Sequence, residues 1–242
     1  MILLLAGTAE ARALAEALSG AGIAACASFA GAVAEIDRIA LPHRVGGFGG
    51  EAGFRRYLSE EGITAVIDAT HPFAAQITPR TARVCGDLGL PYLRLQRPAW
   101  QAGEGDRWTF VARPEDLPRV IPQGARVFLS VGRKELARYQ GLEGREVVLR
   151  SIDPPGDLPD GWRCVQGRPP FPVEEEKALF ALTGIEWVVT KNAGGASSMA
   201  KLVAARQLGL AVAMIERPPL PEGVDVAEDV ETALHWAREH AS

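Results

Sequence analysis

The sequence predicts an α/β fold in which mainly parallel sheets are covered by helices. Three observations support this prediction: short apolar runs recur along the chain, amphipathic segments follow them, and glycine or polar residues separate each run from the next helix. Strands that alternate with helices of about 10–15 residues form parallel sheets with right-handed crossovers. Because both halves of the chain show this pattern, we expect two Rossmann-like α/β domains with an interdomain cleft.

The first half opens with a βα unit, in which the apolar run 2–5 and Gly7 precede an amphipathic segment at 9–18. The pattern then repeats. The further strands expected are 23–27, 65–69 and 92–95, and the further helices are 51–58 and 73–88. Pro72 favours a helix start at this point, because proline suits the first helical turn. This half is expected to form one domain, residues 1–96.

A second domain, residues 97–242, is expected to follow. Prolines and aromatic residues interrupt the periodic pattern between 96 and 122, which is typical of a connecting segment. Beyond it, the expected strands are 126–130, 147–151, 187–190 and 211–215, and the expected helices are 134–139, 173–182, 197–208 and 229–240.

Composition excludes several classes of protein. The 242 residues are 47% hydrophobic and carry a net charge of −4, so we expect neither nucleic acid nor a membrane as partner. An anionic ligand must then be held by a local basic cluster. Cys26, Cys85 and Cys164 lack metal-binding spacing, and the first two are expected to be buried small residues. The apolar start is too short for a signal peptide or membrane span, so a cytoplasmic location is expected.

Gly7, Thr8 and Glu10 lie at the first expected strand-to-helix turn. In open α/β sheets, ligands bind beyond the carboxyl ends of the strands, and a helix N-terminus there attracts phosphate. The turn has one glycine and lacks the G-x-G-x-x-G fingerprint of dinucleotide sites. The alternative interpretation is therefore a tight turn in which Thr8 caps the helix.

Four glycines surround Phe48 in the segment 46–50, which follows Arg44. Glycine costs backbone entropy and is used where a ligand must approach the backbone closely. A flexible surface loop is the alternative.

Asp68, Thr70 and His71 come at the end of another apolar strand, and Pro72 follows them. A carboxylate, a hydroxyl and an imidazole are thus expected where ligands bind. We expect Asp68 and His71 to contact a ligand, with His71 as the candidate catalytic residue. The alternatives are a structural histidine and an aspartate that caps the next helix.

The second domain repeats this design at two strand ends. Lys191, Asn192 and Gly194 follow one expected strand, while Arg133 and Lys134 follow another. Basic side chains and free backbone N–H groups bind anions. Two such strand ends in one domain favour a polyanionic ligand over solvated surface charge.

Together these segments resemble the precorrin-6A reductase and cobalt-precorrin-6A reductase family of cobalamin biosynthesis. The resemblance covers nearly the whole chain, and its most specific parts are the GGFGG and DATHPFA segments in this order. The segments that carry it are 7–11, 28–31, 44–50, 68–76, 191–195 and 216–218.

The resemblance implies an oxidoreductase that transfers hydride from NADPH or NADH to carbon 19 of precorrin-6A, or of its cobalt form. A proton reaches carbon 18, and the product is precorrin-6B. The first domain would bind the dinucleotide, and the second would bind the carboxylates of the tetrapyrrole. Hydride transfer requires the nicotinamide ring to lie against the macrocycle, because the two reacting carbons must be in near contact.

The residues then expected at the cofactor are Gly7, Thr8, Glu10, Ser28, Gly31, Arg44, Gly46, Gly47, Phe48, Gly49 and Thr70. Those expected at the substrate are Asp68, His71, Arg133, Lys134, Lys191, Asn192 and Gly194. No metal is expected.

One position departs from the family pattern. Family members are expected to carry an arginine after the Ser-x-Ala-Gly segment as a partner for a 2′-phosphate, and this chain has Ala32 there. The choice between NADPH and NADH therefore depends on whether Arg38 or Arg44 takes over this role.

Two other functions are compatible with the residues. One is a non-catalytic two-domain binding protein for a small anion, and the other is an enzyme of nucleotide-sugar or methyl transfer. Titration with NADPH, NADH and S-adenosylmethionine separates these alternatives. Binding of reduced nicotinamide alone favours the reductase, and binding of none of the cofactors favours the anion-binding protein.

Overall fold

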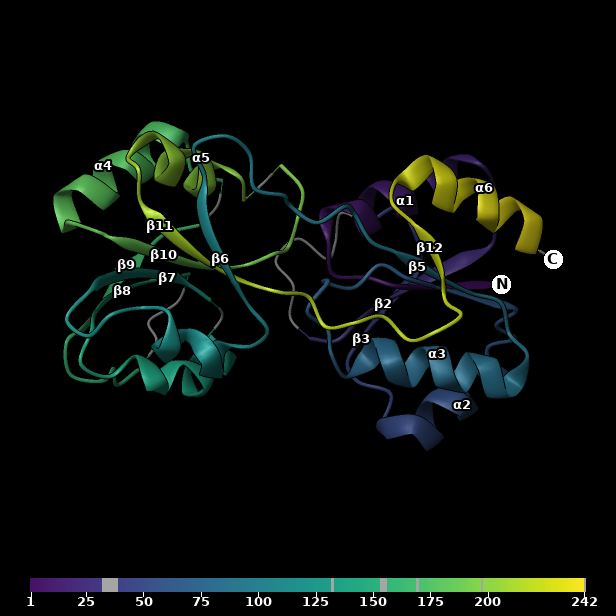
Figure 1. Ribbon diagram of the computed structural model, residues 1–242. Helices are drawn as coiled ribbons and strands as arrows, with labels where there is room; N and C mark the ends of the chain where they lie inside the picture. The colour runs from purple at the N-terminus through teal and green to yellow at the C-terminus, as the bar shows by residue number, and fades with distance from the viewer. Residues whose placement is uncertain (32–38, 132, 153–155, 169, 197, 242) are drawn as a thin grey trace. The chain divides into compact units, whose positions relative to one another are not determined.

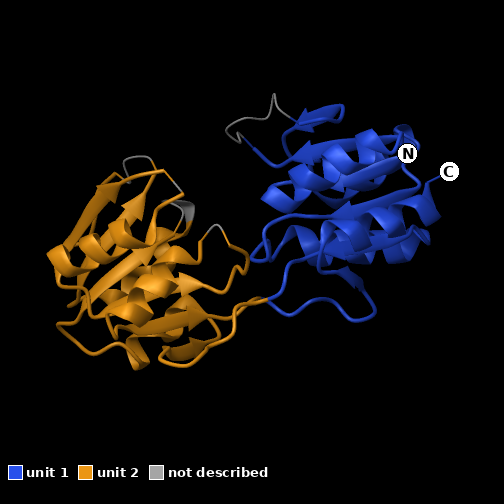
Figure 2. Ribbon diagram, turned by 90° about the horizontal axis from the view of Figure 1, so that it is seen from above, with its two compact units in different colours: residues 1–98, 218–242 blue, residues 99–217 orange. Residues whose placement is uncertain are grey.

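The computed structural model describes residues 1–31, 39–131, 133–152, 156–168, 170–196 and 198–241. The chain forms two compact units, which Figure 2 colours separately. Unit 1 comprises Met1–Pro98 and Pro218–Ser242, and unit 2 comprises Ala99–Arg217. Each unit is built on its own six-stranded sheet. Every described strand pair is parallel, which confirms the predicted fold class.

The sheet of unit 1 has the strand order β12-β5-β4-β1-β2-β3. Its strands are β1 (Ile2–Leu5), β2 (Ala25–Phe29), β3 (His43–Val45), β4 (Ala65–Asp68), β5 (Tyr92–Leu95) and β12 (Asp225–Ala227). The strand order reverses between β1 and β4, so the loops that follow these two strands lie at the topological switch point. Ligands bind at such points in open α/β sheets.

Helices cover both faces of this sheet (Figure 1). In β1, Ile2 and Leu4 belong to one hydrophobic core, which also contains residues of α1 (Ala9–Gly20) and α6 (Val230–His240). Leu3 and Leu5 point to the opposite core, which is shared with α2 (Gly50–Glu60) and α3 (Ile77–Leu88). Burial on both faces explains why this strand is a continuous apolar run rather than an alternating one.

The C-terminal segment belongs to unit 1, so the predicted second domain of residues 97–242 is wrong at its end. β12 pairs with β5, and the α6 residues Ala233 and Ala237 lie in the same core as Leu14 and Leu18 of α1. An amphipathic helix shows that one of its faces is buried, but not against which sheet. The sequence pattern therefore gave no signal for this return.

The sheet of unit 2 has the strand order β6-β11-β10-β7-β8-β9. Its strands are β6 (Arg107–Val111), β7 (Arg126–Ser130), β8 (Glu146–Ser151), β9 (Trp162–Gln166), β10 (Trp187–Lys191) and β11 (Ala211–Ile215). One face is covered by α4 (Val173–Thr183) and α5 (Ala200–Gln207), whose apolar residues join its core. The 3₁₀ helices η2 (Pro114–Arg119) and η3 (Arg133–Leu142) lie on the other side (Figure 1).

The strands that sequence analysis missed, β3, β6, β9 and β12, all lie at sheet edges. At most one residue of each is buried, so none contains the apolar run that marks an internal strand. β6 lies within the stretch that was predicted to be a connection. The predicted α-helix 134–139 is part of the 3₁₀ helix η3.

None of the helices in the described part of the chain is long and apolar enough to cross a membrane.

Candidate functional site

Thr8 connects the loop after β1 to the loop after β4. Its hydroxyl donates to the carbonyl of Ala69 at 2.9 Å and accepts from the backbone N of Ala11 at 3.2 Å. Thr8 is thus the N-cap of α1, as the alternative interpretation predicted. Glu10, in the first turn of α1, pairs with Arg97 at 2.5 Å and so has a protein partner for its charge.

Asp68 ends β4 and is the centre of a buried hydrogen-bond network. Its Oδ1 accepts from Arg94 Nη1 and Thr70 Oγ1, both at 2.6 Å, and from Thr70 N at 3.0 Å. Its Oδ2 accepts from Thr78 Oγ1 at 2.6 Å and from the Tyr92 hydroxyl at 2.9 Å. Burial, reinforced by the charge of Asp68, raises the pKa of Tyr92, so the phenol keeps the proton that it donates.

Arg94, in β5, fixes the loop after β4 through its backbone. The guanidinium donates to the carbonyls of Asp68 at 3.0 Å and Thr70 at 2.9 Å, and to Gln96 Oε1 at 3.2 Å. Its side chain is 1% exposed, and that of Asp68 is 0% exposed. Removal of one partner of such a buried pair strongly destabilises the folded protein, because the other charge stays buried without compensation.

The predicted contact between Asp68 and a substrate is incompatible with this arrangement. Asp68 is fully buried, and both of its carboxylate oxygens are held by protein donors. We therefore revise its role to positioning, since it fixes Thr70, which directly precedes His71. The Thr70 hydroxyl is itself engaged, because it donates to Asp68 and accepts from Arg94 at 3.1 Å.

His71 lies exposed on the loop that this network supports. Its Nδ1 accepts from the backbone N of Phe73 at 3.2 Å. Because Nδ1 must be unprotonated to accept, the proton of the neutral ring is on Nε2, which is therefore the atom that can donate. The predicted helix 73–88 begins later, at Ile77, so this loop is longer than the position of Pro72 suggested.

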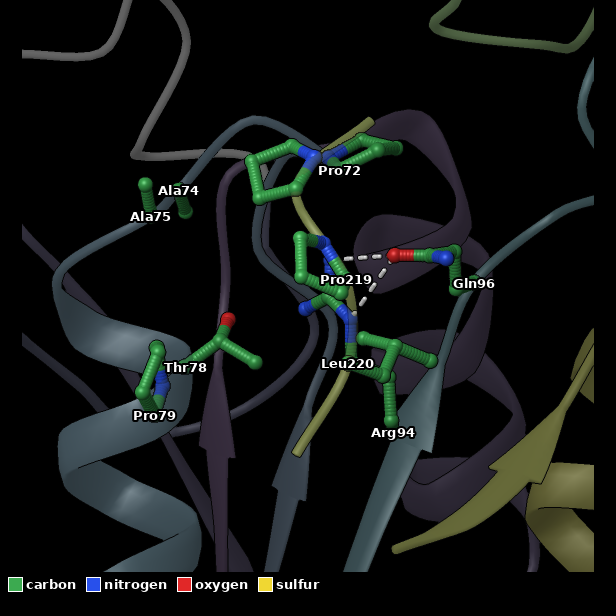
Figure 3. A pocket seen from close by; sticks show the side chains of 10 residues that line it. Pro72, Ala74, Ala75, Thr78, Pro79, Arg94, Gln96, Pro219 and Leu220 are labelled. Atoms are coloured by element: carbon green, nitrogen blue, oxygen red, sulfur yellow. Dashed lines mark hydrogen bonds between the residues drawn. The ribbon is translucent and has the colours of Figure 1, made fainter. Parts of the chain in front are cut away.

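A pocket opens beside this loop, within unit 1 (Figure 3). It is formed where the loop after β4, the end of β5 and the segment that returns from unit 2 meet. The residues that line it are Pro72, Ala74, Ala75, Thr78, Pro79, Arg94, Gln96, Pro218, Pro219 and Leu220. Four prolines make its wall stiff and apolar, and Gln96 adds an amide that is fixed by Arg94.

Arg44 organises the glycine-rich loop after β3. Its Nη1 donates to Ser28 Oγ and to the carbonyl of Gly46, both at 2.9 Å, and its Nη2 donates to the carbonyl of Gly47 at 3.0 Å. The guanidinium also lies 4.2 Å from the centre of the Phe48 ring. Three of the five guanidinium N–H groups of Arg44 thus hold Ser28 and the loop backbone, and Ser28 is 5% exposed.

The loop glycines combine left-handed backbone with open space. Gly46 and Gly49 have φ of 116° and 75°, which disfavours any side chain, whereas Gly47 lies outside this region. A Cβ on any of the three would meet no atom of the described residues within 4 Å, so the described part of the structure leaves the backbone here uncovered. Gly53 of α2 differs, because a Cβ there would lie 1.7 Å from the carbonyl oxygen of Phe48.

In unit 2, Lys191 is the last residue of β10 and Asn192 follows it, and both have protein partners. Lys191 forms an ion pair with Glu135 of η3. The Asn192 side chain accepts from the backbone N of Trp100 at 2.8 Å and donates to the Trp100 carbonyl at 3.0 Å. Asn192 is 6% exposed and its amide is engaged by Trp100, so the structure gives no support to its predicted direct contact with a substrate. Its amide instead holds the segment that enters unit 2.

The loop that continues from Asn192 is fixed at several points. Arg217 donates to the carbonyls of Asn192 at 2.7 Å and Ala193 at 3.0 Å, and the Trp100 indole donates to the Gly195 carbonyl at 2.9 Å. Gly194 and Gly195 have φ of 68° and 77°. The loop is therefore rigid enough to present backbone groups to a ligand.

Two sequence predictions, on Ala32 and Arg38, concern residues that lie outside the described residues, as do the side chains of Arg133 and Lys134. Gly7 and Gly31 are described and exposed, and a Cβ on either would meet none of the described residues within 4 Å.

Sequence analysis missed the residues that support these loops, namely Arg94, Tyr92, Trp100 and Arg217. A signal existed for one of them. Arg94 interrupts the apolar run of β5, and a charged residue inside a buried strand requires an opposite charge. The acidic end of β4 offered that partner in Asp68.

These features define the class of the protein. Two parallel sheets carry ordered, partly uncovered loops at the carboxyl ends of their strands, which is the arrangement of ligand-binding doubly wound α/β proteins. Within that class, the chain belongs to the family described as precorrin-6x reductase CbiJ/CobK, whose model matches residues 1–238. The resemblance seen in the sequence is thereby confirmed.

Individual relatives agree with this family over their full length. The precorrin-6A reductase of Rhodobacter capsulatus is 41% identical over 245 residues, which cover 100% of this chain and 97% of the relative. That of Mycobacterium tuberculosis is 43% identical, with 97% and 96% covered. The cobalt-precorrin-6A reductase of Priestia megaterium is 32% identical, with 97% of both chains covered.

A solved structure supports the fold as well. The structure titled "CobK precorrin-6A reductase" has a TM-score of 0.90 and 41% identity, and the match covers 100% of this chain and 97% of that one.

Proposed function

We propose that this chain reduces precorrin-6A to precorrin-6B, with NADPH as the hydride donor. The observation that carries this proposal is the family match over residues 1–238, together with relatives of 41–43% identity that are named precorrin-6A reductases. The relatives named cobalt-precorrin-6A reductases are less similar, at 32% identity or below. The metal-free substrate is therefore proposed over its cobalt form.

Unit 1 is proposed to hold the dinucleotide. The backbone at Gly7, Gly31 and Gly49 is uncovered, so a phosphate or ribose can approach where a side chain would otherwise stand. α1 begins directly after the Gly7 turn and directs its N-terminal N–H groups to that space. When bound, the dinucleotide supplies the hydride. The protein supplies the N-terminal N–H groups of α1, which attract negative charge, and loops of fixed geometry.

His71 is proposed to orient the substrate through its Nε2 proton. The Asp68–Arg94 network holds the preceding residue, Thr70, and the hydrogen bond from Phe73 fixes the tautomer. The alternative role, in which His71 protonates carbon 18, would make it a general acid. General acid catalysis typically contributes about 10²–10⁴-fold to the rate, so mutation separates the two roles.

Unit 2 is proposed to bind the carboxylates of the tetrapyrrole. The support is that unit 2 has basic residues at two strand ends: Lys191 is the last residue of β10, and Arg133 and Lys134 come after β7. The chain as a whole has a net charge of −4, so attraction for a polycarboxylate has to be concentrated locally. Lys191 shares its charge with Glu135, and a substrate carboxylate would compete for the same ammonium.

Turnover with defined substrates tests this proposal. Purified protein is mixed with precorrin-6A and either NADPH or NADH, and the loss of reduced nicotinamide is followed together with the mass of the tetrapyrrole. The expected result is the gain of two hydrogens by the tetrapyrrole, with one nicotinamide oxidised per turnover and a higher kcat/KM for NADPH. Nicotinamide binding without reduction of precorrin-6A would reject the proposal.

Mutation of Lys191 tests the assignment of the two units. Lys191→Ala should raise the KM for precorrin-6A and leave NADPH affinity nearly unchanged, with a smaller effect at high salt because screening weakens the attraction. A variant that loses NADPH binding but keeps its substrate affinity would show that the units have the opposite roles.

A further inference from the structure

Lys201 is a buried lysine that the proposed function leaves without a role. It lies in the first turn of α5 and is 9% exposed. Its ammonium donates to the carbonyl of Ser198 at 3.2 Å, which is its one hydrogen bond within the described residues. The ammonium also lies 5.8 Å from the centre of the Trp100 ring. An ammonium has three N–H donors, so two of them have no hydrogen-bond partner in the described part of the chain.

Lys201 shares its surroundings with a buried ion pair. Arg150 of β8 donates to both carboxylate oxygens of Glu176 of α4, at 2.7 and 2.8 Å. The guanidinium lies between two aromatic rings, with its centre 3.9 Å from Phe171 and 4.8 Å from Phe128. Because Glu176 is fully engaged by Arg150, these three charged side chains bring together two cations and one anion.

Two features make the charged form of Lys201 unfavourable in the ligand-free protein. Burial removes water from the ammonium and lowers its pKa to about 8, which the charge of Arg150 lowers and that of Glu176 raises. The side chain also reaches back to Ser198, at the positive end of the α5 dipole. Local rules that are broken without compensation are expected at functional sites.

We propose that Lys201 binds a peripheral carboxylate of the tetrapyrrole, which rests on the function proposed above. Lys191 is already paired with Glu135 and Asn192 with Trp100, whereas Lys201 has N–H groups to offer. A carboxylate at this place balances the excess positive charge of the cluster. The positive N-terminal end of the α5 dipole is unfavourable for the ammonium, but it attracts a carboxylate.

The loop that leads to Lys201 supports this role. It is anchored at Asn192 by Trp100 and Arg217, and at Gly195 by the Trp100 indole. Trp100 therefore holds the loop through its hydrogen bonds, and the centre of its ring lies 5.8 Å from the Lys201 ammonium. A ligand bound by Lys201 is expected to change tryptophan fluorescence, which gives a readout that is independent of turnover.

Replacement of Lys201 by Met removes the charge and keeps a long flexible side chain suited to a buried site. In Lys201→Met the KM for precorrin-6A should rise about tenfold to a hundredfold, as expected for the loss of a hydrogen bond to a charged group. The affinity for NADPH should stay within about twofold of wild type. The Tm of the ligand-free protein should be unchanged or higher, because a buried unbalanced charge is removed.

Lys177→Met is the matched control. Lys177 lies in α4 of the same unit and pairs with the exposed Glu174. The same chemical change there should leave the KM for precorrin-6A, the affinity for NADPH and the Tm unchanged.

The pH dependence provides a second test, which uses Lys201→Arg. The wild-type KM for precorrin-6A should rise above about pH 8, where the ammonium loses its proton. The charged groups that face it are Glu176 and Arg150. An arginine keeps its charge in this range, so Lys201→Arg should not show the rise.

Two results would overturn the inference. One is a folded Lys201→Met protein whose KM for precorrin-6A lies within about twofold of the wild-type value. This result counts against the inference even if the Tm falls by more than about 4 °C. The other is a rise of KM with pH that persists in Lys201→Arg, which decides the matter if Lys201→Met does not fold. If the wild type binds precorrin-6A but does not reduce it, the proposed function fails, and tryptophan fluorescence titration with precorrin-6A still tests Lys201.

Discussion

Removal of Arg94 should destabilise unit 1 more than removal of any surface arginine. In Arg94→Met, Asp68 would stay fully buried without its counter-charge, and the carbonyl of Thr70 would lose its donor. Breaking a buried pair on one side costs about 3–5 kcal/mol, which corresponds to a fall in Tm of roughly 10 °C for a protein of this size. Arg56→Met is the control, because Arg56 is exposed on α2 and its pair contributes about 1 kcal/mol or less.

A double-mutant cycle tells whether the uncompensated charge causes this loss. Asp68→Asn/Arg94→Met leaves no buried charge, so its free energy of unfolding should exceed the value that the two single changes predict by addition. Thermal unfolding gives the totals, and hydrogen exchange of residues 65–76 reports on the loop itself. Equal effects of Arg94→Met and Arg56→Met, or strict additivity in the double variant, would refute the role assigned to this pair.

Three other predictions concern the cofactor loop, the histidine and the cysteines. Gly49→Val should weaken NADPH binding about tenfold, because valine is strained in the left-handed backbone conformation of this position, whereas Gly47→Val should have a smaller effect. Equal Kd values of the two variants in a fluorescence titration would contradict this prediction. His71→Asn should reduce kcat less than about tenfold if His71 only orients the substrate, and a larger loss in steady-state assays would favour the acid role. Burial raises the pKa of Cys85 to about 12, so alkylation at pH 8 followed by peptide mass analysis should modify Cys164 first, and early labelling of Cys85 would contradict its burial.

The internal strands could be predicted from the sequence because burial on both faces requires apolar residues at every position. β1 is apolar throughout and β4 is apolar up to its last residue, Asp68, and each strand is buried along its whole length. The edge strand β6 could not be predicted in this way. Four of its five residues are not fully buried, so burial does not require them to be apolar. The return of β12 and α6 to unit 1 was hidden for another reason, since it depends on long-range pairing rather than on local pattern.

The candidate site was predicted in its location more than in the roles of its residues. The loops were found because they follow strand ends, and this holds for Thr8, His71 and Lys191. Which polar groups face a ligand was not predictable, because it depends on partners far apart in the chain. Asp68 is occupied by Arg94, and Asn192 is occupied by Trp100, 92 residues away. Both were mistaken for ligand contacts because each is a polar residue at or beside the end of a strand.

The proposed function depends most directly on hydride transfer between NADPH and the macrocycle. The decisive measurement uses NADPH that is deuterated at the transferable position of the nicotinamide, with precorrin-6A and the wild-type protein in ordinary water. We predict one deuterium in the isolated product, located at carbon 19 by NMR, and hydrogen from water at carbon 18. A reduced product without deuterium, or oxidation of NADPH that leaves precorrin-6A unchanged, would contradict the proposal.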